Sequence, residues 1–158
     1  MVSFKKLSES DLNFLNQVRN GYCDEFLHDS RQFTLNETKE WYNKTNPDFY
    51  IIEYEGNSIG YFRLSNYSSN NRNIYIGADI SPEYKGKGFG EMSYRQFIPF
   101  LFEKYNLHKI SLEVLSTNNV AINLYNKLGF VVEGVKRDEV FKNGKWVNSC
   151  LLYTSPSP

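Results

Sequence analysis

The chain has 158 residues, of which 41% are hydrophobic and 23% are charged. A chain of this length suits one domain and can bury about two-thirds of its unfolded surface without a disulfide or metal staple. Its 18 basic and 18 acidic residues balance, which argues against general binding to nucleic acid or to anionic membranes.

Two further features bound the class of protein. No apolar run approaches the length of about 18 residues that a transmembrane helix requires. Cys23 and Cys150 are too few for a disulfide framework and show no metal-ligand spacing. The sequence therefore predicts a cytoplasmic domain over residues 1–153 that binds no metal, followed by a disordered tail at 154–158.

The first half of the chain predicts strands and two helices. Capping residues and hydrophobic spacing indicate the helices, and β-prone residues between turn signals indicate the strands. In chain order these elements are a strand at 2–7, a helix capped by Ser8 or Ser10 and reaching about Asn20, a helix opened by the capping box of Thr34 and Glu37, and strands at 49–54, 59–64 and 73–80. The polar residues 65–72 are predicted to form a hairpin loop.

The second half adds two helices between strands. Residues 88–104 have helical spacing with a kink expected at Pro99, and the helix at 118–128 is ended by Gly129. Strands are predicted at 109–115, 130–137 and 146–153, the last two joined by the hairpin signal Asn143-Gly144. The order β-α-α-β-β-β-α-β-α-β-β mixes hairpins with strand–helix–strand units, which predicts an α/β fold with a mixed sheet and helices on both faces.

A glycine-rich turn stands where the strand at 73–80 passes into the helix at 88–104, with the sequence Lys85-Gly86-Lys87-Gly88-Phe89-Gly90. Glycines let main-chain amides approach an anion closely, and a helix N-terminus adds unpaired N–H groups and partial positive charge. With the two lysines, these groups predict a pyrophosphate cradle; a surface turn that binds nothing is the alternative. A Walker-A loop and a Rossmann fingerprint are both disfavoured, because no Gly-Lys-Ser/Thr closes the turn and hairpin strands precede it.

A second motif follows, with the sequence Asn118-Asn119-Val120-Ala121-Ile122-Asn123-Leu124-Tyr125-Asn126-Lys127-Leu128-Gly129-Phe130. Together the two motifs resemble the GNAT superfamily of N-acetyltransferases, most specifically between residues 74 and 132. The acetyl-CoA motif of that family has Arg or Gln, two residues, Gly, one residue and then Gly or Ala. Lys85, Gly88 and Gly90 occupy these places, and Lys85 departs from the pattern because it keeps a charge without the guanidinium fork.

The resemblance implies that the protein binds acetyl-CoA. The backbone of 80–82 would pair with the pantetheine arm as an added strand, and the amides of 86–90 would hold the pyrophosphate. Asn118 would hydrogen-bond the pantetheine or its surroundings, and Asn123 and Lys127 would reach the phosphates, with a solvated lysine as the alternative at 127. The predicted cofactor site comprises Ile80, Ser81, Pro82, Lys85, Gly86, Lys87, Gly88, Phe89, Gly90, Asn118, Asn123, Tyr125 and Lys127.

Acetyl transfer to an amine needs a neutral amine, stabilisation of the developing oxyanion and a proton for the departing thiolate. The resemblance implies Tyr125 as the acid, since its phenol, with an ordinary pKa of about 10, keeps its proton at neutral pH. It implies Glu113, on the strand at 109–115, as the base. A core tyrosine and a solvated strand glutamate are the alternatives. Asp79 is a second candidate base, because it is the carboxylate nearest the place, here near Tyr75, where many relatives carry a Glu.

The acceptor pocket is expected between the first two helices and the hairpin loops. Its candidate walls are Arg19, Asn20, Tyr22, Phe26, His28, Arg31 and Trp41, and the predicted substrate-binding residues are His28, Arg31 and Tyr75. These walls are mostly neutral or basic, whereas a polyamine site should collect carboxylates.

Two stretches favour different acceptors. The run 26–31 followed by Trp41 resembles enzymes that act on amino-sugar nucleotides, whereas 130–153 resembles spermidine and ribosomal-protein acetyltransferases. The sequence thus predicts transfer to a primary amine of a small molecule, with an amino-sugar nucleotide ahead of a polyamine or a protein N-terminus, by a monomer or homodimer. A non-catalytic CoA-binding sensor is the competing class, but it does not require Glu113 and Tyr125 together.

Overall fold

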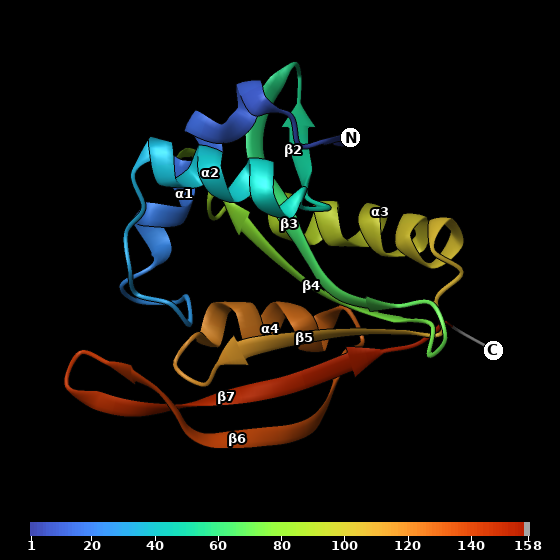
Figure 1. Cartoon of the computed structure of the whole chain (residues 1–158). Coiled ribbons are helices and arrows are strands. Elements are labelled where there is room, and N and C mark those ends of the chain that lie inside the picture. Colours follow the sequence, from blue (N-terminus) through green and yellow to red (C-terminus); the bar gives the residue numbers. More distant parts are fainter. Residues whose placement is uncertain (157–158) are drawn as a thin grey trace.

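The computed structural model describes residues 1–156, in which seven strands form one mixed sheet in the order β1-β2-β3-β4-β5-β7-β6. The elements are β1 (Ser3–Lys6), α1 (Leu12–Tyr22), α2 (Leu35–Thr45), β2 (Tyr50–Tyr54), β3 (Asn57–Ser68), β4 (Asn73–Ile80), α3 (Phe89–Lys104), β5 (Lys109–Leu115), α4 (Asn119–Lys127), β6 (Val131–Lys142) and β7 (Lys145–Thr154), with short 3-10 helices at Glu9–Asp11 and Pro82–Tyr84. This order of strands and α-helices is the predicted one, and the mixed α/β class is confirmed (Figure 1).

Local signals explain where the helices begin. Thr34 Oγ1 accepts from the Glu37 amide at 3.1 Å, and Glu37 Oε1 accepts from the Thr34 amide at 3.0 Å, so the predicted capping box opens α2. Ser8 instead precedes the short 3-10 helix, and α1 begins later, at Leu12. Within residues 1–156, no helix is both long and apolar enough to cross a membrane.

Three predicted boundaries were wrong. The polar residues 65–68 are not loop, because their backbone continues β3 and pairs with β4, from Ser65 with Tyr75 to Ser68 with Asn73. β6 extends to Lys142, since its backbone pairs with β7 up to the Asn143-Gly144 turn. Thr154 ends β7 by pairing with β5 and does not belong to a tail; residues 157–158 of the predicted disordered tail lie outside the described residues.

Two apolar clusters sit on opposite faces of the sheet. Neighbouring strand residues point to opposite sides, so Tyr61 packs with α1 whereas Phe62 packs with α3. The Phe62 ring stacks on Phe97 with 4.0 Å between ring centres. Helices thus cover both faces of the sheet at β3 and β4, which lie in the middle of the strand order.

The parallel neighbours β4 and β5 separate toward their carboxyl ends. They pair only at Asn73 with Lys109, Ile74 with Ile110 and Tyr75 with Ser111, although β4 continues to Ile80 and β5 to Leu115. Figure 1 shows the two strands diverging, with β4 leading toward α3 and β5 leading toward α4. The fold therefore opens a space between two strand ends, each of which leads into a helix.

The close approach of β3 to β4 requires glycine at position 60. A Cβ on Gly60 would lie 2.5 Å from the Asp79 carbonyl oxygen, so we expect Gly60→Ala to lower the free energy of unfolding by about 1–3 kcal/mol. The control is Gly21→Ala, where a Cβ meets no atom within 4 Å and removal of glycine from a helix stabilises by up to about 1 kcal/mol. Thermal unfolding of both variants is the measurement; equal midpoints would contradict the expectation.

Candidate active site

A cavity of about 640 Å³ opens where β4 and β5 separate. Its walls come from the end of β4, the glycine turn, α3, β5, α4 and the segment after α1. It brings together most of the residues that the sequence singled out, namely His28, Asp79, Ile80, Lys85, Gly86, Gly88, Phe89, Gly90, Glu113, Asn118 and Tyr125. It also includes Arg63, Ser93 and Tyr94, which sequence reasoning missed.

The glycine turn has the geometry of an anion cradle. Gly86 and Gly88 have φ of +71° and +83°, and a Cβ on either would meet no atom within 4 Å, so the left-handed backbone rather than lack of space selects glycine. α3 starts at Phe89, and its first backbone bond runs from Met92 to the Gly88 carbonyl at 3.1 Å. The amides of the first turn are therefore left to bind a ligand at this wall, which fits a pyrophosphate.

Tyr125 lies on α4, 7% exposed, with its hydroxyl 3.2 Å from that of Tyr94 on α3. Burial raises the pKa of the Tyr125 phenol, while the hydrogen bond with Tyr94 and the positive charge of Arg63 oppose that rise. Burial is the main cause that raises the pKa of the Tyr94 phenol, and the same hydrogen bond adds to that rise. Either hydroxyl can donate in this bond; with Tyr94 as the donor, the Tyr125 proton is free to be donated toward the cavity.

Glu113 belongs to a polar cluster built from four separate parts of the chain. Lys136 Nζ donates to Glu113 Oε1 at 3.0 Å, and Ser149 Oγ donates to Oε2 at 3.2 Å. His28 Nε2 lies 2.8 Å from Ser149 Oγ and 3.4 Å from Glu113 Oε2. Burial lowers the pKa of His28, with Glu113 opposing, so the imidazole is neutral near pH 7. Sequence reasoning had found Glu113 and His28, but not Ser149 or Lys136.

Asp79 has a cationic partner that the sequence did not reveal. Arg63 Nε lies 3.2 Å from Asp79 Oδ2, and the Asp79 side chain is only 7% exposed. The two residues share a face of neighbouring strands, because Arg63 pairs with Gly77 in the register of β3 and β4. Asp79 and Glu113 thus each face a cation, but only Glu113 also has the neutral imidazole of His28 beside it, which makes Asp79 the weaker candidate for the base.

Several predicted cofactor residues lie outside the cavity wall. The backbone groups of Ser81 and Pro82 are already bonded: the Ser81 amide donates to Ile59, and the carbonyls of both accept from the following turn. The Ile80 carbonyl accepts from the Tyr22 hydroxyl. A ligand that pairs with this backbone like an added strand would therefore do so at 78–80, whose residues line the cavity, and not at the predicted 80–82.

The remaining cofactor predictions concern polar side chains. Lys127 Nζ pairs at 2.9 Å with Glu91, which lines the cavity, and Lys87 Nζ donates to the Glu83 carbonyl at 3.1 Å; neither lysine itself lines the cavity. Asn123 is exposed and away from the cavity. Asn118 does line it, with its side-chain oxygen capping α4 through the Ala121 amide at 3.3 Å.

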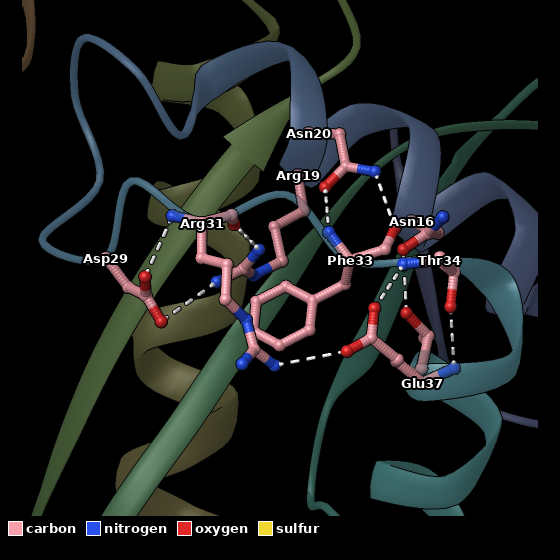
Figure 2. Close-up of polar contacts among 9 residues, drawn as sticks. Asn16, Arg19, Asn20, Asp29, Arg31, Phe33, Thr34 and Glu37 are labelled. Atoms are coloured by element: carbon pink, nitrogen blue, oxygen red, sulfur yellow. Dashed lines mark hydrogen bonds and ion pairs between the residues drawn. The ribbon is translucent and has the colours of Figure 1, made fainter.

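Two of the three predicted substrate-binding residues also lie elsewhere. Figure 2 shows Arg31 beside the ring of Phe33, at 4.1 Å from its centre, with Glu37 as its ionic partner at 3.4 Å. Tyr75 is half-buried where β4 still pairs with both neighbouring strands. Only His28 lines the cavity.

Comparison with known proteins was made in sequence and in structure. Residues 15–130 match the acetyltransferase (GNAT) family. The chain is 29% identical over 158 residues to a spermidine N(1)-acetyltransferase of Vibrio cholerae, covering 96% of this chain and 91% of the relative. It is 29% identical over 156 residues to the spermidine N(1)-acetyltransferase of Escherichia coli K12, covering 96% and 84%. The crystal structure of spermidine N-acetyltransferase from Vibrio cholerae with CoA and spermine has a TM-score of 0.92 and 28% identity, covering 98% of this chain and 95% of that one.

The backbone of Gly88 provides a test of acetyl-CoA binding. Gly88→Ala forces a side chain into the left-handed region at a cost of about 1–2 kcal/mol, so we expect the Kd of acetyl-CoA to rise about tenfold. In the control Gly90→Ala the new Cβ lies 3.5 Å from Leu124, an ordinary contact, and we expect a smaller change. Calorimetric titration of both variants measures this, and unchanged affinity of the Gly88 variant would remove the turn from the binding site.

Proposed function

Because the chain belongs to the GNAT acetyltransferase family, we propose that it transfers an acetyl group from acetyl-CoA to the primary amine of a small molecule. The observation that carries the proposal is the single cavity that holds the glycine turn, Tyr125 and the cluster around Glu113. An anion cradle, a proton donor and a proton acceptor are the parts that acetyl transfer to an amine requires. A non-catalytic sensor would need only the first.

Different groups of the chain would bind different parts of acetyl-CoA. The amides of the first turn of α3 and the ammonium of Lys85 would hold the diphosphate of acetyl-CoA, which supplies the acetyl group as a thioester. The backbone of 78–80, free of β5, would bind the pantetheine arm in the manner of an added strand. Ser93 Oγ is buried and has no partner among the described residues, so it is a further donor at this wall.

The reaction needs two proton transfers, one from the amine to a base and one from Tyr125 to the sulfur. The amine nitrogen loses one proton as it bonds to the acetyl carbon, and Tyr125 donates one proton to the sulfur as the carbon–sulfur bond breaks. If Ser149 gives its proton to Glu113, then His28 Nε2 must donate to Ser149, which leaves the lone pair on Nδ1. We therefore assign His28 as the proton acceptor, because an imidazole titrates near neutral pH, and Glu113 as the group that orients it.

The choice of acceptor changes in the light of the comparisons. The two relatives named above carry the name spermidine N(1)-acetyltransferase, which favours a polyamine over an amino-sugar nucleotide. The amino-sugar prediction rested on the run 26–31 followed by Trp41, and Arg31 of that run pairs with Glu37 and does not line the cavity.

Tyr125→Phe separates an enzyme from a sensor. We expect amine-stimulated thiol release from acetyl-CoA in the wild type, and a fall in kcat of about 10²–10⁴-fold in the variant, because the proton donor is lost. The Kd of acetyl-CoA should stay within about twofold, since the phenyl ring keeps its packing against Tyr94 and Phe130. Equal turnover would remove Tyr125 from the mechanism, and CoA binding without turnover of any amine would favour the sensor.

The pH profile tests the assignment of His28. Because its pKa is lowered and the neutral imidazole is the active form, kcat/KM should fall only as pH drops below about 6.5. Glu113→Gln removes the charge that opposes this lowering, so the acid limb should move to lower pH. His28→Gln should lower kcat/KM about 10²-fold and abolish the limb. An acid limb that survives in His28→Gln and disappears in Glu113→Gln would instead make Glu113 the base.

A further inference from the structure

A second cavity, of about 260 Å³, lies between α1, α2 and the sheet face that carries Tyr61. Its walls are largely aromatic, with Phe33, Trp41 and Phe49 among them. Arg63 lines this cavity and also the large one, so the two spaces meet at its guanidinium. This volume is below the range of about 300–1,000 Å³ for drug-sized ligands, so the small cavity suits one side group of a ligand and not a nucleotide.

Arg63 is held in a fixed place at this junction. A Cβ on Gly77 would lie 2.6 Å from Arg63 Nη2, so the guanidinium lies across the bare backbone of the neighbouring strand. Its Nε faces Asp79 at 3.2 Å, which is the one acidic partner of Arg63 within residues 1–156. The side chain is 40% exposed, so the terminal nitrogens remain able to donate to a ligand.

A second guanidinium faces the small cavity. Arg19 lies over the ring of Phe33, 4.1 Å from its centre, and donates through Nη1 to the Arg31 carbonyl at 3.0 Å (Figure 2). Asn20 fixes Phe33 by two hydrogen bonds with its backbone, at 2.9 and 3.0 Å. The nearest carboxylate to Arg19 is that of Asp29, 3.9 Å away and 61% exposed, so the positive charge is weakly compensated.

The small cavity also contains a polar atom without a partner. The Tyr61 hydroxyl is fully buried and has no hydrogen bond among the described residues. Burial raises the pKa of this phenol well above its ordinary value, so it is a neutral donor. Because Tyr61 has no exposed surface and its neighbour in the β-sheet register is Asp79, the hydroxyl leaves this wall uncharged and does not itself reach a ligand.

The carboxylates of the large cavity are already neutralised. Asp79 pairs with Arg63, Glu113 with Lys136 at 3.0 Å, and Glu91 with Lys127 and Arg95, both at 2.9 Å. No carboxylate lines the small cavity among the described residues. A polycation would find paired acids on one side and two arginines on the other, whereas an anion would find free donors.

We propose that the acceptor is a primary amine that also carries a carboxylate or phosphate and an aromatic or branched apolar group. The anion binds Arg63, the apolar group fills the small cavity beside Arg19, and the amine faces Tyr125 in the large cavity. This proposal rests on the proposed function, and it departs from the polyamine that the names of the two relatives favour. The products are the acetylated amine and CoA with a free thiol, so no further reactant is needed.

The test compares amines that differ in one group. Phenylalanine and phenethylamine share the amine and the ring, but only the first carries a carboxylate; O-phosphoethanolamine and spermidine supply the phosphate and the polycation. With acetyl-CoA and wild-type enzyme, we expect phenylalanine to exceed phenethylamine in kcat/KM by about tenfold or more, the value of one charge-assisted contact. Turnover of O-phosphoethanolamine above spermidine would identify phosphate as the bound anion.

Two variants assign the effect to Arg63. Arg63→Met should bring the ratio of phenylalanine to phenethylamine close to one, and Arg63→Lys, which keeps the ion pair with Asp79 but loses the fork, should leave an intermediate ratio. Unchanged Kd of acetyl-CoA shows that each variant is folded. Preference for spermidine or phenethylamine in the wild type, or an unchanged ratio in both variants, would overturn the inference alone. Acetyl-CoA binding with no turnover of any amine would overturn the proposed function and with it this inference.

Discussion

The early separation of β4 from β5 is the constraint on which the rest of the site depends. After three paired positions, the two parallel strands no longer share hydrogen bonds, and buried backbone groups without partners are costly. Apart from the Ile80 carbonyl, which accepts from the Tyr22 hydroxyl, the groups of β4 beyond Tyr75 that no longer face a paired strand must be satisfied by water or a ligand. The same divergence places the start of α3 and the start of α4 on either side of one cavity. A mobile arm with amide groups is a natural occupant of such a gap.

Most of the charged side chains that line the large cavity belong to ion pairs. Each of its carboxylates faces a cation from another element, so removing either partner would leave a charge in a partly buried place. His28 differs from these charged groups because its imidazole is neutral, and Ser149 holds it beside Glu113. In our proposal this uncharged imidazole is the base, and the paired acids position other groups.

Local signals in the sequence predicted most of the fold. The capping box of Thr34 and Glu37, the Asn143-Gly144 turn and the glycine turn each act within a few residues, and each appears where it was expected. The element order followed from them. The glycine turn was also the strongest part of the site prediction, because its backbone and its helix N-terminus need no distant partner.

The partners of the predicted residues were not accessible from the sequence. Ser149 and Lys136 reach Glu113 only through the register of β5, β6 and β7, and that register shifts twice within the β6–β7 ladder. A bulge moves every later side chain by one position and so changes the face that it occupies. Arg63 shares this difficulty: it resembles any exposed strand arginine until the register places it opposite Gly77.

The two halves of the reaction place different demands on the chain. In our proposal acetyl-CoA is bound largely through backbone amides and turn geometry, which survive extensive side-chain substitution. Acceptor recognition depends on the charge and shape of side chains, where one substitution can reverse a preference. Our proposal for the acceptor therefore rests on the two arginines around the small aromatic cavity, and it departs from the spermidine named for relatives that are 29% identical.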